Sequence, residues 1–150
     1  MPQMESKREP DIWQGERGDL IVSYPAKTVI LFRYTGHISA GVMPTIVTSV
    51  DRVLRTRIRP DIFVDLYEVT GYDSQYRIEV TRWGDTIRER VGTFMLLVRS
   101  KLVAMGVSVS NLALGGFMTA TAKRSQFDIA LAAATRRGRN AMPLQASSGR

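Results

Sequence analysis

Cysteine is absent from this sequence of 150 residues, and histidine occurs only once, as His37. Without cysteine the chain can form no disulfide framework, no thiolate metal site and no cysteine nucleophile. His37 lies beside a glycine in a segment expected to be a loop, so no Ser/His/Asp catalytic set is visible. Zinc-binding, P-loop and Gly-x-Ser-x-Gly motifs are also absent. We therefore expect no metal, no cofactor and no enzymatic activity.

Long hydrophobic runs are missing as well. Apolar runs such as residues 94–98 are far shorter than the roughly 20 residues that span a membrane. Residues 1–11 are charged and lack the apolar segment of a signal peptide. The sequence therefore indicates neither a transmembrane segment nor secretion, and the lack of cysteine is typical of a reducing compartment. The expected location is the cytoplasm.

Positive charge is in excess, since 21 Lys and Arg residues face 14 Asp and Glu residues, which gives a net charge of +7. Two clusters could attract nucleic acid electrostatically: Arg55, Arg57 and Arg59, and Arg136, Arg137 and Arg139. Aromatic residues do not alternate with these arginines as a stacking surface requires. Basic residues in the last turn of a helix also stabilise its dipole. Nucleic-acid binding is therefore the least supported hypothesis.

The hydrophobic pattern predicts alternating strands and helices. Residues 20–24 and 27–34 are rich in β-branched and aromatic side chains, which predicts an antiparallel strand pair with Pro25 in its turn. Apolar residues at steps of three and four predict helices over about 43–54, 74–90, 102–112 and 127–135. Short apolar runs predict strands over 61–69, 93–98 and 117–121.

This order predicts a single α/β domain over residues 18–137. Its sheet is expected to be mixed, with about five strands: the N-terminal antiparallel hairpin and then parallel strands, covered by about four helices. Gly138 is expected to end the last helix. Residues 1–17 and 138–150 are polar or small and are expected to be flexible tails.

The most informative motif follows the strand 61–69. Asp65-Leu66, Val69-Thr70 and Asp73-Ser74 occur in this order, with two residues between successive pairs, from this strand to the start of the next helix. This order resembles the STAS family, the anti-sigma-factor antagonist domain, in which an Asp-Leu strand end leads through a Val-Thr turn to an Asp-Ser helix start. Residues 99–116, which end in Gly115-Gly116, resemble the bacterial SpoIIAA-like branch, which is sometimes grouped with lipid-exchange domains. The likeness spans about residues 19–134.

The resemblance implies a non-catalytic, STAS-like regulatory module whose partner is a signalling protein, either an anti-sigma factor or a kinase-like regulator. The partner-binding loop is expected to comprise Val69, Thr70, Gly71, Tyr72, Asp73, Ser74, Gln75 and Arg77. In the family, the hydroxyl that accepts phosphate comes directly after the Asp-Ser pair. Gln75 stands there, so the kinase-controlled switch does not transfer to that position. Ser74 and Thr70 are the nearby hydroxyls available for phosphorylation, although Asp73 or Ser74 can simply cap the helix.

Asp65 admits two roles. A carboxylate at the end of a buried strand can have a shifted pKa and act as an acid or base. The favoured role is structural, with the carboxylate accepting hydrogen bonds from the backbone of residues 69–73 and so ordering the loop.

A second functional hypothesis is a carrier for a lipid or another apolar ligand, which the SpoIIAA-like resemblance suggests. Six large side chains could line the required cavity: Met43, Trp83, Phe94, Met95, Met105 and Phe117. Side chains of this kind more often fill a core. A homodimer formed through the N-terminal hairpin also stays open.

Overall fold

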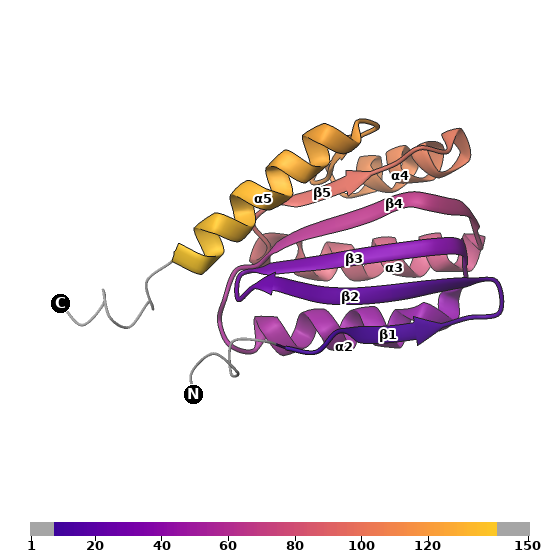
Figure 1. Cartoon of the computed structure of the whole chain (residues 1–150). Coiled ribbons are helices and arrows are strands. Elements are labelled where there is room, and N and C mark those ends of the chain that lie inside the picture. The colour runs from indigo at the N-terminus through magenta and orange to yellow at the C-terminus, as the bar shows by residue number, and fades with distance from the viewer. Residues whose placement is uncertain (1–7, 141–150) are drawn as a thin grey trace.

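A computed structural model describes residues 8–140, which form one six-stranded sheet in the order β1-β2-β3-β4-β5-β6 (Figure 1). The strands are β1 (Asp11–Gln14), β2 (Gly18–Ala26), β3 (Val29–Ile38), β4 (Asp61–Tyr72), β5 (Phe94–Leu97) and β6 (Thr119–Thr121). The first three strands pair antiparallel, and β3 to β6 pair parallel. The predicted α/β fold class is confirmed, with one more strand than expected.

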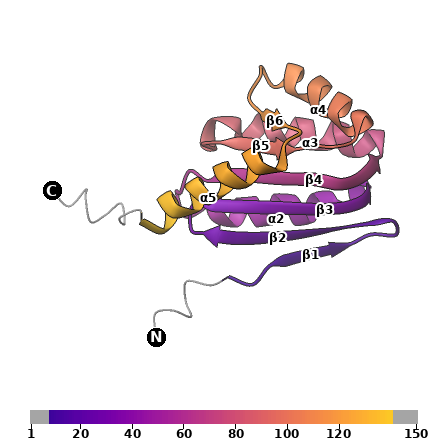
Figure 2. The ribbon, with the colours of Figure 1, turned by 45° about the horizontal axis from the view of Figure 1, so that its top comes forward.

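Within residues 8–140, four α-helices and two short 3-10 helices connect or follow the strands. They are η1 (Ala40–Val42), α2 (Met43–Leu54), α3 (Ser74–Ile87), η2 (Arg88–Arg90), α4 (Lys101–Ala113) and α5 (Arg124–Asn140). Helices α2, α3 and α4 cover one face of the sheet, and α5 crosses the other (Figures 1 and 2). The sheet is therefore the middle layer of three.

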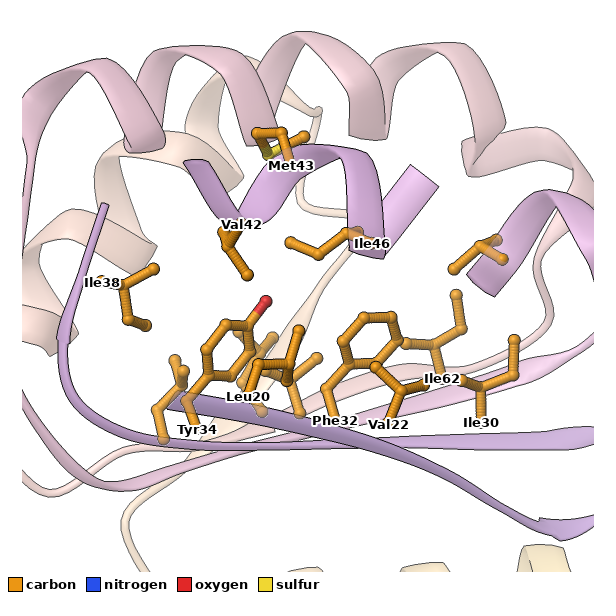
Figure 3. Packing of buried hydrophobic residues seen from close by; sticks show 14 of the residues in the cluster. Leu20, Val22, Ile30, Phe32, Tyr34, Ile38, Val42, Met43, Ile46 and Ile62 are labelled. Atoms are coloured by element: carbon orange, nitrogen blue, oxygen red, sulfur yellow. The ribbon is translucent and has the colours of Figure 1, made fainter. Parts of the chain in front are cut away.

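The central strands are buried on both faces because successive side chains point to opposite sides of a strand. In β3, Phe32 and Tyr34 pack in the larger core under η1 and α2, where Val42 and Ile46 meet them (Figure 3). Leu31 faces the smaller core beneath α5 instead. This two-sided burial explains the continuous apolar runs that predicted parallel strands.

The predicted N-terminal tail is wrong over β1, which pairs antiparallel with β2 at the edge of the sheet. Asp11 anchors this strand. Its carboxylate accepts hydrogen bonds from the Tyr24 hydroxyl and from Ser49 Oγ at 2.8 Å, and it lies 3.2 Å from Arg52 Nη1. Burial raises the pKa of Asp11, but these hydrogen bonds and the charge of Arg52 outweigh it and lower the pKa below its usual value. Residues 1–7 lie outside the described residues.

Pro25 does not form the hairpin turn. It lies within β2, and the turn falls at Lys27 and Thr28. The pairing register shifts between Ser23 and Ala26. An irregular position of this kind suits proline, which has no backbone N–H to donate.

Gly138 does not end the last helix, since α5 continues to Asn140. A Cβ atom at Gly138 would lie 2.8 Å from Cβ of Ala26, which is too close for two carbon atoms. The glycine therefore permits α5 to pack tightly against the end of β2. Residues 141–150 of the predicted C-terminal tail lie outside the described residues.

Candidate functional site

The predicted loop between β4 and α3 is mostly strand. Residues of β4 continue to pair with β3 beyond Val69, with Gly71 opposite His37 and Tyr72 opposite Ile38. Only Asp73 separates the end of β4 from the first residue of α3, Ser74. The junction is therefore held by the sheet on one side and by the helix on the other.

Exposure alternates along this segment. Val69 and Gly71 are buried and cannot contact a partner, so their predicted place in the binding surface is wrong. Tyr72, Asp73 and Arg77 are half-buried. Thr70, Ser74 and Gln75 are exposed. We call the three exposed residues together with the half-buried Asp73 the junction surface: Thr70, Asp73, Ser74 and Gln75.

Asp73 occupies the N-cap position of α3 with an extended backbone, yet its side chain makes no capping hydrogen bond. One carboxylate oxygen, Oδ1, lies 2.7 Å from Nε2 of His37. The Asp73 backbone N–H donates to the carbonyl of Ile38 at 2.9 Å. The capping prediction is therefore wrong for Asp73, and Ser74, as the first helical residue, does not occupy the cap position either.

Sequence reasoning missed His37 as the partner of Asp73. It lies in β3, not in a loop, and is 36 positions from Asp73. The contact arises because β3 and β4 are parallel neighbours whose carboxyl ends meet at one edge of the sheet. No local pattern could have paired these two residues.

The exposed polar side chains of the junction surface are available to a partner. Ser74 and Thr70 present accessible hydroxyls. Gln75 donates from Nε2 to Glu79 one helical turn later, at 2.7 Å. Arg77 turns inward enough to line the cavity described below. The side chain of Arg77 is therefore less accessible to a partner than its predicted place in the binding loop requires.

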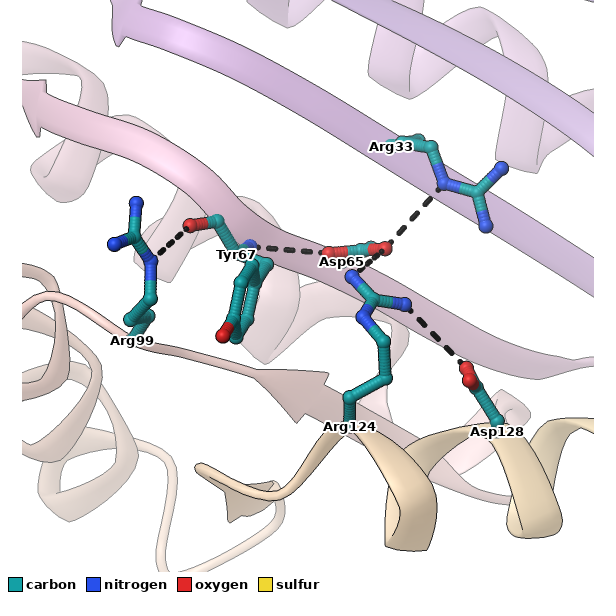
Figure 4. A network of polar contacts seen from close by, with 6 residues as sticks. All are labelled: Arg33, Asp65, Tyr67, Arg99, Arg124 and Asp128. Carbon is teal, nitrogen blue, oxygen red and sulfur yellow. Dashed lines mark hydrogen bonds and ion pairs between the residues drawn. The ribbon is translucent and has the colours of Figure 1, made fainter.

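Asp65 does not order the junction (Figure 4). Its buried carboxylate pairs with Arg33 at 3.3 Å and with Arg124 at 3.0 Å, and it accepts a hydrogen bond from the Tyr67 backbone N–H at 3.0 Å. The predicted contacts with the backbone of 69–73 are replaced by these. The bond to Asp65 outweighs partial burial and raises the pKa of Arg124.

The same network fastens α5 to the sheet. The guanidinium groups of Arg99 and Arg124 lie over the Tyr67 ring, with their Cζ atoms 4.9 and 5.0 Å from its centre (Figure 4). Arg99 also donates to the Tyr67 carbonyl. Because α5 lies on the opposite face from α3, Asp65 belongs to the scaffold and lies away from the junction surface.

A cavity of about 100 Å³ lies between the sheet and the inner sides of α3 and α4. Its walls are mainly apolar and include Ile62, Leu66, Val80, Trp83, Phe94 and Val107. Of the six side chains predicted to line a cavity, Trp83, Phe94 and Phe117 do so. The three methionines do not: Met43 and Met95 pack in the two cores, and Met105 is 65% exposed.

Two hydroxyl pairs accompany the apolar walls. Tyr76 donates to the hydroxyl of Tyr34 at 3.3 Å, and Thr81 donates to Ser110 at 2.7 Å. All four residues line the cavity. Burial raises the pKa of Tyr76 to about 12 and holds the pKa of Tyr34 well above its usual value. Both phenols are therefore neutral at physiological pH.

Within residues 8–140, His, Asp and Glu side chains form no group of three that could hold a metal ion. None of the helices in this range is both long and apolar enough to cross a membrane.

No family model matches the chain, and no curated protein matches it either. The fold, in contrast, has solved counterparts. An uncharacterized protein of the DUF3478 family from Shewanella loihica PV-4, described as having a SpoIIAA-like fold, superimposes with a TM-score of 0.55. The likeness covers 81% of this chain and 91% of that protein at 10% sequence identity. The chain therefore has the SpoIIAA-like fold that the resemblances of residues 65–74 and 99–116 predicted.

Proposed function

We propose that this chain is a non-catalytic regulatory module that docks a signalling protein through the junction surface. The observation that supports it is the exposure of Thr70, Ser74 and Gln75 on a backbone fixed from within. The bond from Asp73 to His37 and its backbone bond to Ile38 provide that support. A rigid display of this kind lowers the entropy lost on binding. The STAS resemblance suggests an anti-sigma factor or a kinase-like regulator as the partner.

The buried acid of the domain supports a non-catalytic role. Asp65 is held between Arg33 and Arg124 by ion pairs of 3.3 and 3.0 Å. Its carboxylate therefore attaches α5 to the sheet. A general base would instead lie beside a reacting group from which it takes a proton.

Phosphorylation at Ser74 or Thr70 offers a means of regulation that Gln75 cannot provide. Ser74 begins α3, and a phosphate there would add about two negative charges near the positive end of the helix dipole. Thr70 is exposed at the end of β4. Either modification would change the charge that a docked protein meets.

Affinity capture from cells that express the protein at its native level tests this proposal. Wild type is compared with Ser74→Glu and with a matched control, Ser125→Glu, which is exposed near the start of α5 on the other face of the sheet. We expect the control to recover the wild-type partner and Ser74→Glu to lose it. Recovery of the same partner by all three proteins would reject the junction surface.

A second candidate function, carriage of a lipid or another apolar ligand, is favoured by the cavity beneath α3 and α4. Native mass spectrometry of protein purified from its own cells tests it. A bound molecule of constant mass is expected, and its repeated absence would reject carriage.

We also propose a cytoplasmic location. We further propose a homodimer, which would form through β1, because β1 covers the predicted hairpin of β2 and β3 at this side of the sheet. The supporting feature is the sheet edge, where β1 lies beside β2 and Ile12 is 60% exposed. An unpaired edge strand is a template for strand addition by a second copy. Light scattering is expected to give a dimer mass, and a monomer mass at every concentration would reject the dimer.

A further inference from the structure

The space inside the cavity beneath α3 and α4 is small. An engineered cavity of about 150 Å³ in another protein holds a benzene molecule. The cavity in this chain, at about 100 Å³, is smaller. A long acyl chain has several times the carbon atoms of benzene and exceeds this space. A single ring or a short branched chain is the largest group that it can enclose with modest adjustment of the walls.

The walls also define the polarity of an occupant. Most are aliphatic or aromatic, so they favour a mainly apolar molecule. The pair Tyr34 and Tyr76 shares one hydrogen bond between two hydroxyls, which leaves one O–H proton that this bond does not use. The pair Thr81 and Ser110 differs, because a helical serine can donate its remaining proton to the carbonyl one turn earlier. The tyrosine pair is therefore the donor for an acceptor atom on the ligand.

We propose that this cavity binds a small, mainly apolar molecule of about one ring that carries one hydrogen-bond acceptor, such as a carbonyl oxygen, held by the Tyr34–Tyr76 pair. This inference rests on the second candidate function and narrows it from lipids in general to ring-sized molecules. Binding of such a molecule does not require that a partner protein be docked.

The position of the cavity links it to the junction surface. Tyr72, Tyr76 and Arg77 line the cavity, and they flank Asp73, Ser74 and Gln75 in the chain. A molecule in the cavity thus touches the inner side of the segment whose outer side is exposed. Occupancy would regulate docking from within the domain, at the surface where Gln75 replaces the family's phosphorylated hydroxyl.

Trp83 provides a direct readout because it lines the cavity and the chain contains only one other tryptophan, Trp13. The fluorescence of Trp13→Phe is titrated with benzaldehyde, with toluene, which has the same ring without the acceptor, and with oleate as a lipid probe. Calorimetry on the wild-type protein provides a second measurement. We expect saturable binding of benzaldehyde, about fivefold tighter than toluene, as one hydrogen bond predicts. Oleate is expected neither to bind in the cavity nor to displace benzaldehyde.

Two variants and one control variant locate the site. The double variant Tyr34→Phe/Tyr76→Phe keeps the shape and removes both hydroxyls, so benzaldehyde and toluene should bind it equally. Gly84→Ala places a methyl group at the cavity wall, where its Cβ lies 3.5 Å from Leu114 Cδ1 and needs no rearrangement. It should weaken benzaldehyde binding by about fivefold or more. Ser108→Ala, exposed on the outer side of α4, should leave affinity unchanged.

The outcomes distinguish failure of the ring-sized site from failure of lipid carriage. Absence of saturable benzaldehyde binding, or equal binding to wild type and Gly84→Ala, would overturn the proposed site. Oleate that displaces benzaldehyde would overturn the size limit while leaving carriage of a lipid intact. A benzaldehyde preference that persists in the double variant would overturn the role of the tyrosine pair.

Discussion

The phenol ring of Tyr72 packs directly against the backbone of Gly106, so the end of β4 and the middle of α4 meet without an intervening side chain. An added Cβ at Gly106 would lie 2.7 Å from Cζ of Tyr72. Because Tyr72 precedes Asp73 in the chain, this contact connects α4 with the junction surface.

The variant Gly106→Ala should destabilise the protein by about 1–3 kcal/mol, because the new methyl group must displace the Tyr72 ring. Gly84→Ala is a matched control, since Gly84 is also helical and buried but has room for a methyl group. It should stabilise the protein by about 0.5–1 kcal/mol. Urea unfolding of both variants measures these changes. Stabilisation by both would show that Tyr72 does not press on α4.

The variant Asp65→Asn should reduce stability by about 2 kcal/mol, because it removes a buried carboxylate charge that pairs with two partly exposed arginines, Arg33 and Arg124. Asp128→Asn removes a carboxylate that also pairs with Arg124, but at an exposed position. Its effect should stay below about 0.5 kcal/mol. Thermal unfolding of the two variants is compared at pH 7. Equal effects would contradict a special role for the buried acid.

The pKa of Asp11 predicts how β1 responds to acid. A pKa that is lowered in the folded state contributes stability above the usual value of 3.8, and that stability is lost as the pH falls through the folded pKa. Asp11→Asn should cost about 1 kcal/mol at pH 7. The difference from wild type should shrink below pH 3.8. Asp19→Asn, at an exposed position in β2, is the control and should change stability at pH 7 by less than about 0.5 kcal/mol. A constant difference across the pH range would contradict the anchoring of β1 by its charge.

The order of most strands and helices could be predicted because burial imposes a periodicity that the sequence displays directly. The helix 43–54 was predicted from apolar steps of three and four, and α2 spans Met43–Leu54. Strand β1 could not be predicted in this way, since it has four residues and alternates only between half-buried and exposed positions. Its stability depends on Asp11 contacts with residues distant in sequence, such as Ser49.

The sequence predicted where the candidate site lies in the chain, but it did not predict the strand pairing and side-chain contacts around it. The Asp-Ser pair at the start of α3 was located correctly, whereas pairing with β3 extended β4 through the expected turn. The partner of Asp73, His37, and the ion pairs of Asp65 join residues from different strands and helices. The cavity is a space left by packing, which depends on the positions of α3 and α4 over the sheet and leaves no pattern in the sequence.

The most direct test of docking is site-specific photo-crosslinking in living cells. A photoreactive phenylalanine derivative replaces Gln75 at the junction surface or, as a matched control, Gln126, which is exposed in the first turn of α5 on the opposite face. The proposed function predicts that a protein is crosslinked at position 75 and that the same protein is absent at position 126. No crosslinked protein at position 75, or identical products at both positions, would contradict it.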